Sequence, residues 1–241
     1  MSKLVAPFRI LVPLVALAAV LLLAGSGPGY RLGWWEYRQG FEMLSWALYA
    51  GLGAAALAVV ALALPRVRAG WAAALGLALV LGLGTAYLPW QWRQRAQSVP
   101  RIHDITTDLQ NPPRFVAVLP LRKGAPNTAE HGGKELAEAQ QKGYPDIKPL
   151  TLDVPPPMAF ARALETAERM GWVLVASNSA EGRIEATDTT FWYGFKDDIV
   201  VRVTPAEGGS RIDVRSVSRM GRSDIGTNAQ RIRRYLAKLT S

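Results

Sequence analysis

Three long apolar runs at the start of the chain constrain its fold more than any other feature. They are rich in Ala, Leu, Val and Gly and contain almost no charged residues. Each is close to the roughly 20 residues that an α-helix needs to cross a bilayer. We therefore predict transmembrane helices at residues 8–25, 41–64 and 70–89. They define a transmembrane region of residues 1–92 and leave residues 93–241 as a separate polar domain.

The first run has a second interpretation. Lys3 and Arg9 lie at its start and small residues follow its end, which is also the pattern of a cleaved signal peptide. The other two runs are predicted spans in either case. Small residues that would permit close contact between the helices are Gly51, Gly76, Gly82 and Gly84.

The distribution of Lys and Arg predicts the orientation, because cytoplasmic loops carry an excess of basic residues. Lys3 and Arg9 lie near the amino terminus, and Arg66 and Arg68 lie in the short link between the second and third runs. We therefore expect the amino terminus and this link to be cytoplasmic. The chain would then be a multi-pass protein of the plasma (inner) membrane with an extracytoplasmic C-terminal domain.

Charge and cysteine content limit the function classes. The chain has no Cys, which excludes thiol catalysis and cysteine-ligated metals. Its formal net charge is +9, and residues 201–241 hold nine basic residues against three acidic ones. No nucleic-acid-binding motif accompanies this charge, so the predicted partner is an anionic membrane surface and not a nucleic acid. No cofactor is predicted.

The polar domain has the pattern of an α+β fold. Apolar spacing predicts a helix after Pro157 and a closing helix that begins near Ser223 or Asp224. Between them, four stretches read as strands. This order predicts an antiparallel sheet of about four to five strands flanked by helices. The predicted strands are residues 172–176, 183–191, 198–204 and 211–218.

Proline-rich sequence precedes this pattern. There we predict a strand at Phe115–Leu119 and a short helix near Lys134–Lys142. The helix after Pro157 is expected to bury a stripe of Ala161, Leu164, Ala167 and Met170. The closing helix is expected to bury Ile225, Ala229, Ile232, Leu236 and Leu239, with most of its basic residues off this stripe.

Two polar clusters could carry chemistry. His103 and Asp104 follow the last span, and a histidine beside carboxylates suits a metal site or a general base. Their spacing matches no specific metal motif, and a turn held by local hydrogen bonds explains them equally. Asp197 and Asp198 follow four aromatic residues that begin at Phe191. Neighbours in a strand point to opposite faces, which argues against an acid/base pair.

A third cluster lies where the last strand ends and the closing helix begins. Helix N-termini attract anions through their free N–H groups, and arginines bind phosphate or carboxylate in a bidentate manner. The alternative is that the arginines pair internally with Asp224. The candidate ligand-binding residues here are Arg215, Ser218, Arg219, Arg222, Ser223, Asp224, Asn228 and Arg231.

The same residues carry a resemblance. Phe195-x-Asp197-Asp198, followed by a second motif over residues 215–232, resembles the family called domain of unknown function 1499. The resemblance covers roughly residues 100–241 and implies no established activity. Many members have a cysteine pair near the start of the domain, where this chain has none, so a thiol-dependent role is not implied. The His103-Asp104 segment resembles a membrane-anchored subgroup.

Three functions fit these observations. The leading hypothesis is a membrane-anchored binding or structural module, without catalysis or a metal, for an anionic lipid head group or an envelope polymer. The second is an envelope hydrolase or transferase that uses His103, Asp104, Asp197 and Asp198. The third is an accessory subunit whose spans dock onto a larger membrane protein.

Overall fold

The computed structural model describes residues 2–240, so the two terminal residues lie outside the description. The chain forms two compact units, each described by itself below. Unit 1 comprises Met1–Arg95 and Trp192–Gly194. Unit 2 comprises Ala96–Phe191 and Phe195–Ser241.

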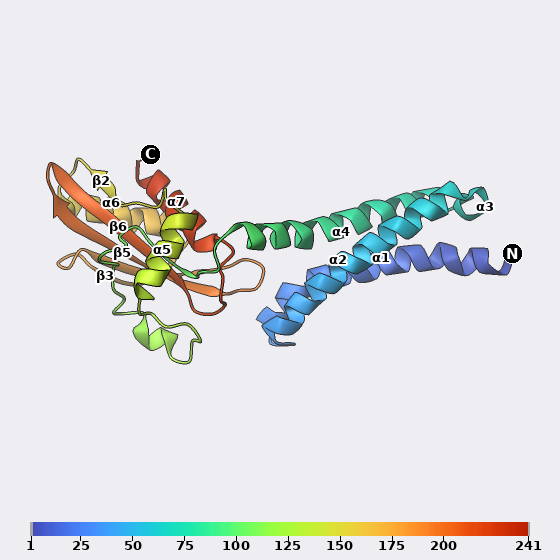
Figure 1. Ribbon diagram of the computed structural model, residues 1–241, viewed down its shortest axis with the longest axis horizontal. Helices are drawn as coiled ribbons and strands as arrows, with labels where there is room; N and C mark the ends of the chain where they lie inside the picture. The colour runs from blue at the N-terminus through green and yellow to red at the C-terminus, as the bar shows by residue number, and fades with distance from the viewer. Residues whose placement is uncertain (1, 241) are drawn as a thin grey trace. The chain divides into compact units, whose positions relative to one another are not determined.

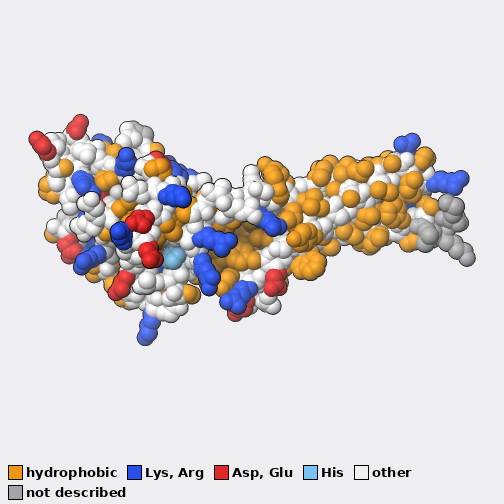
Figure 2. Space-filling view, in the orientation of Figure 1, with side chains coloured by type: hydrophobic (Ala, Val, Ile, Leu, Met, Phe, Trp, Pro, Cys, Tyr) orange, Lys and Arg blue, Asp and Glu red, His pale blue; other side chains and the backbone are white. Residues whose placement is uncertain are grey.

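Unit 1 is built from apolar helices (Figure 1). Three of them are long and apolar enough to cross a membrane, and each of these candidate spans has 27 residues. Hydrophobic side chains cover their surface (Figure 2), as a lipid environment requires. The three predicted apolar helices are therefore confirmed, although each continues beyond its apolar run into flanking polar residues. The helices are α1 (Ser2–Arg31), α2 (Tyr37–Ala63), α3 (Pro65–Arg68) and α4 (Ala72–Ser98).

Helices α2 and α4 approach closely at two glycines. A Cβ added at Gly51 would lie 2.7 Å from the carbonyl oxygen of Gly82, and one added at Gly82 would lie 2.7 Å from that of Gly51. At Gly76 and Gly84 an added Cβ would meet no atom within 4 Å. Two of the four glycines singled out in the sequence thus permit close helix packing.

Unit 2 contains a six-stranded antiparallel sheet in the order β1-β6-β5-β4-β3, with β2 also paired to β6. The predicted α+β fold and its four predicted strands, which correspond to β3 to β6, are confirmed. Strands β1 and β2 have three residues each, too few for alternation to be recognised in the sequence. The strands are β1 (Asp104–Thr106), β2 (Leu150–Leu152), β3 (Val173–Asn178), β4 (Arg183–Thr189), β5 (Lys196–Ala206) and β6 (Gly209–Ser218).

The two faces of the sheet are covered differently. Ile199, Val201 and Val203 of β5 pack with helices α6 (Pro156–Arg169) and α7 (Thr227–Thr240) in the main core. We call this side the helix face. On the other side, which we call the loop face, Val200 packs against Phe115 and Val118. Both residues belong to the long segment that follows β1, residues 107–132, which we call the connecting segment. Helix α5 (Gly133–Gly143) follows the connecting segment and matches the predicted short helix.

The strand predicted at Phe115–Leu119 is wrong. Residues 115–118 form a turn, and a 3₁₀ helix, η1 (Leu119–Arg122), follows. The N–H groups of residues 116, 117 and 118 donate to the carboxylate of Glu185 at 3.0–3.1 Å instead of to a neighbouring strand. Pro120 also has no N–H to contribute to a strand ladder.

Two predicted helix surfaces need correction. In α6 the buried residues include Ala159, Phe160 and Ala163, whereas Ala161 is exposed, because a second apolar stripe faces the sheet. Helix α7 begins at Thr227, a few residues after the predicted N-cap. Its buried face includes Tyr235 and also the charged Arg231, which finds carboxylate partners inside the unit.

Candidate functional site

The candidate residues of the sequence divide between the two faces of the sheet. Asp197 and Asp198 are neighbours in β5, and each is almost completely buried. Asp197 contacts a residue of α7 on the helix face, and Asp198 contacts residues on the loop face. The expected opposite orientation of the two carboxylates is therefore present, and they do not form a pair.

A polar network centred on Arg231 fills the helix face near the end of the sheet. Its guanidinium donates to Asp197 Oδ2 at 2.7 Å and to Asp188 Oδ2 at 2.8 Å. It also donates to Ser216 Oγ and to Asn228 Oδ1. The amide of Asn228 donates in turn to Ser218 Oγ and to the main-chain carbonyl of residue 103, both at 3.0 Å. Each of these side chains thus has its partners within the fold.

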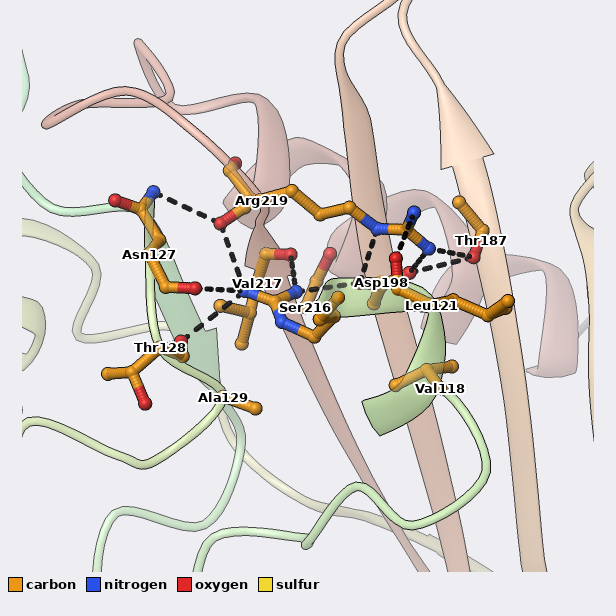
Figure 3. Close-up of polar contacts among 12 residues, drawn as sticks. Val118, Leu121, Asn127, Thr128, Ala129, Thr187, Asp198, Ser216, Val217 and Arg219 are labelled. Carbon is orange, nitrogen blue, oxygen red and sulfur yellow. Dashed lines mark hydrogen bonds and ion pairs between the residues drawn. The ribbon is translucent and has the colours of Figure 1, made fainter. Parts of the chain in front are cut away.

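A second network surrounds Asp198 on the loop face (Figure 3). Asp198 accepts hydrogen bonds from Arg122 at 2.6 Å, Arg219 at 2.9 and 2.8 Å, and Thr187 at 2.7 Å. Burial alone would raise the pKa of Asp198, but these hydrogen bonds outweigh it and hold the pKa below its ordinary value. The carboxylate is therefore ionised and fully occupied.

Asp104 forms a third buried pair, with Arg215. The Arg215 guanidinium donates to both carboxylate oxygens, at 2.9 and 2.7 Å, and to the carbonyls of Pro113 and Ala129. It also lies over the Phe115 ring, 5.2 Å from the centroid. Asp104 and Arg215 thus hold the connecting segment onto the sheet.

The turn between β6 and α7 is organised by Asp224. Its carboxylate accepts from the N–H groups of Gly226 at 2.8 Å and Asn228 at 2.7 Å, and burial raises its pKa. The Ser223 hydroxyl accepts from the N–H of Ile225 at 3.2 Å. Asp224 therefore accepts hydrogen bonds from N–H groups at the start of α7 that were predicted to bind an anion. Arg222 is exposed and forms no ion pair with any described residue.

The candidate catalytic residues do not lie together in one site. They are His103, Asp104, Asp197 and Asp198. The His103 side chain makes no hydrogen bond with the residues described, and only its main chain joins the Arg231 network. Within residues 2–240, no group of three or more His, Asp or Glu side chains is placed to hold a metal ion. Of the aromatic stretch after Phe191, Trp192 and Tyr193 belong to unit 1.

A pocket of about 800 Å³ lies on the loop face, formed by residues between Gln110 and His131 together with Arg215. Two of its lining residues carry a buried nitrogen without a hydrogen-bond partner among the described residues, Arg122 Nε and His131 Nε2. Arg122 is only 7% exposed. A buried N–H group without a partner costs about 1–3 kcal/mol, so these two donors call for an acceptor.

The tautomer of His131 follows from its neighbours. Its Nδ1 accepts from the N–H of Gly133 at 3.2 Å, which assigns the proton of the neutral ring to Nε2. Burial lowers the pKa of His131, and Arg215 lowers it further against the opposite influence of Asp104. The ring is therefore neutral at pH 7 and presents Nε2–H as a donor.

Sequence reasoning missed most of this pocket. Of the residues that line it, only Arg215 was a candidate. Arg122, Asn127 and His131 lie in a segment without helical or strand periodicity, so no pattern placed them together. One feature of the sequence could have indicated the pocket. Residues 109–129 contain three basic residues and no Asp or Glu.

Comparison with known proteins identifies a family. Residues 104–239 match the model of a family described as protein of unknown function (DUF1499). This range contains the sheet, helices α5 and α6, the pocket and all of α7 except its last residue. No curated protein matches the chain.

Proposed function

The chain belongs to the DUF1499 family, and from this premise we propose that it is a membrane-anchored binding module without catalysis of its own. The three candidate spans supply the anchor. The carboxylates that an enzyme would use, Asp104, Asp197 and Asp198, are each bound by a buried arginine. A general base must reach the proton that it removes, so these occupied groups favour binding over hydrolysis or transfer.

The pocket carries the proposal of an anionic ligand. Arg122 Nε and His131 Nε2 are buried donors without acceptors, and both residues line it. The charges of Arg122 and Arg215 are balanced by Asp198 and Asp104. Two further exposed charges line the pocket, Arg114 and Glu130, and neither forms an ion pair inside the described range. A phosphate or carboxylate group, with several acceptor oxygens, suits the two unpaired donors.

The two histidines of the chain allow a direct test. We would label histidine with ¹⁵N in the full chain in detergent micelles and titrate inorganic phosphate at constant ionic strength. We expect the resonance of His131 Nε2 to shift with saturation and that of His103 to stay unchanged. Equal shifts at both rings, or no shift at His131, would contradict the proposal.

A matched pair of arginine variants adds a second readout. Arg114→Gln should weaken phosphate binding by roughly twofold to fivefold, the effect of about 0.4–1 kcal/mol that an exposed charge pair provides. Arg162→Gln removes an exposed arginine of α6 that does not line the pocket, and it should leave the affinity unchanged. The same loss in both variants would indicate general charge screening and no site.

We also propose the orientation that the basic residues favour, with the amino terminus cytoplasmic and unit 2 extracytoplasmic in the plasma (inner) membrane. Arg66 and Arg68 of α3 supply the short basic link that supports it. A reporter that is active only outside the cytoplasm should work when fused after Ser241 and fail when fused at Arg68. The reverse result would place the pocket in the cytoplasm.

A further inference from the structure

The connecting segment exposes three large apolar side chains beside the pocket. Val116 is 50% exposed, Leu119 is 47% exposed and Leu121 is 53% exposed. We call these three residues the apolar rim. Leu119 also lines the pocket itself.

The rim is held in place by the fold. Phe115 and Val118, which alternate with rim residues, are 6% and 0% exposed and anchor the segment on the loop face. Four hydrogen bonds from its main chain to the buried Glu185 fix the turn between them. Exposed apolar side chains that the fold holds in place on a segment that lines a pocket are candidates for a binding surface.

Charge defines the kind of molecule that would cover the rim. Arg114 and Lys123 flank it, and both are exposed. No Asp or Glu occurs between Asp108 and Glu130. Apolar side chains bordered by basic ones are typical of surfaces that bind anionic lipids, where acyl chains and head groups are recognised together.

We propose that the pocket and the apolar rim bind one anionic phospholipid. Its phosphate lies in the pocket beside His131, Arg122 and Arg114, and its acyl chain lies on Val116, Leu119 and Leu121. This inference rests on the proposed anion-binding function and names its ligand class. The three candidate spans of the same chain favour a lipid over a soluble phosphate as the ligand.

The absence of Cys makes a site-specific test possible. Leu121→Cys introduces a single thiol on the rim, and Leu174→Cys introduces one on edge strand β3, where Leu174 is 40% exposed. Each full-length variant would carry an environment-sensitive fluorophore in nanodiscs of phosphatidylglycerol or phosphatidylcholine with brominated acyl chains. Bromine quenches only a fluorophore that contacts the chains.

We expect the label at position 121 to be quenched at least twofold more in phosphatidylglycerol than in phosphatidylcholine, and the label at position 174 to show no such difference. Equal quenching of position 121 in both lipids, or none in either, would overturn the lipid assignment. Higher salt should reduce the difference, because part of the attraction is electrostatic.

The histidine resonances separate this inference from the proposed function. If inorganic phosphate shifts His131 but position 121 is not quenched, the pocket binds anions and the lipid assignment fails. If position 121 is quenched while phosphatidylglycerol leaves His131 unshifted, the rim touches lipid without a head group in the pocket, and the inference again fails. Without a His131 shift by either probe, both proposals fail.

Discussion

Replacing Asp198 with Asn tests whether the buried ion pairs hold the connecting segment on the sheet. Asn keeps the size of the side chain but removes its charge, and so leaves Arg122 and Arg219 without a counter-ion. The side chains of Asp198 and Arg122 are 0% and 4% exposed, so water cannot replace the lost interaction. Removal of one partner from a buried pair costs about 3–5 kcal/mol.

A matched control comes from the exposed pair of Asp146 and Arg233, whose side chains are 55% and 41% exposed. Asp146→Asn makes the same chemical change but should cost only about 0.2–1 kcal/mol, because solvent screens the pair. The comparison therefore isolates the effect of burial.

Amide hydrogen exchange of the full chain in detergent, followed by mass spectrometry, measures both variants. In peptides from β5, Asp198→Asn should accelerate the slowest exchange by roughly 10² to 4 × 10³, the equivalent of 3–5 kcal/mol. Asp146→Asn should change the same peptides less than about tenfold. If the two variants accelerate exchange equally, the buried charge does not stabilise the fold as argued.

Three further predictions concern other parts of the molecule. Asn228→Ala removes the acceptor of the buried Ser216 hydroxyl and one of the acceptors of Arg231, so urea unfolding should show a loss of about 1–3 kcal/mol for each donor left unpaired. Because the pKa of Asp198 is lowered, its stabilisation is complete above the unfolded value of about 3.9 and is lost as the pH falls through the folded pKa. The difference in unfolding free energy between wild type and Asp198→Asn should therefore be constant from pH 8 to pH 5 and shrink below pH 4. Gly51→Leu should lower the melting temperature in detergent because its Cβ would meet the Gly82 carbonyl, whereas Gly84→Leu meets open space and should not.

The sequence predicted the helices and strands whose apolar residues follow a regular pattern. The apolar runs are long enough to specify membrane helices, and the alternation in β5 placed Ile199, Val201 and Val203 on one face. The same alternation predicted that Asp197 and Asp198 point apart. These features depend on local periodicity, which a single sequence displays directly.

The candidate site was harder to predict, because its contacts join residues that are far apart in the sequence. Arg122 meets Asp198 across 76 positions, and Arg215 meets Asp104 across 111. Nothing in the local pattern at Phe115 showed that its neighbours would donate to Glu185 instead of to a strand. Of the arginines that were candidates for an anion site near α7, Arg215, Arg219 and Arg231 have carboxylates of the fold as partners, and Arg222 forms no ion pair with any described residue.

The anchoring of the connecting segment also determines when the pocket can assemble during synthesis. Glu185, Asp198 and Arg215 all follow the pocket segment in the chain, and so do the carbonyls of Val217 and Ser218 that accept from Arg122. A ribosome delivers residues 110–131 first and their supports only as β4, β5 and β6 emerge. A nascent chain that stops before β6 therefore lacks the assembled pocket, although its three apolar helices and residues 110–131 have already been made.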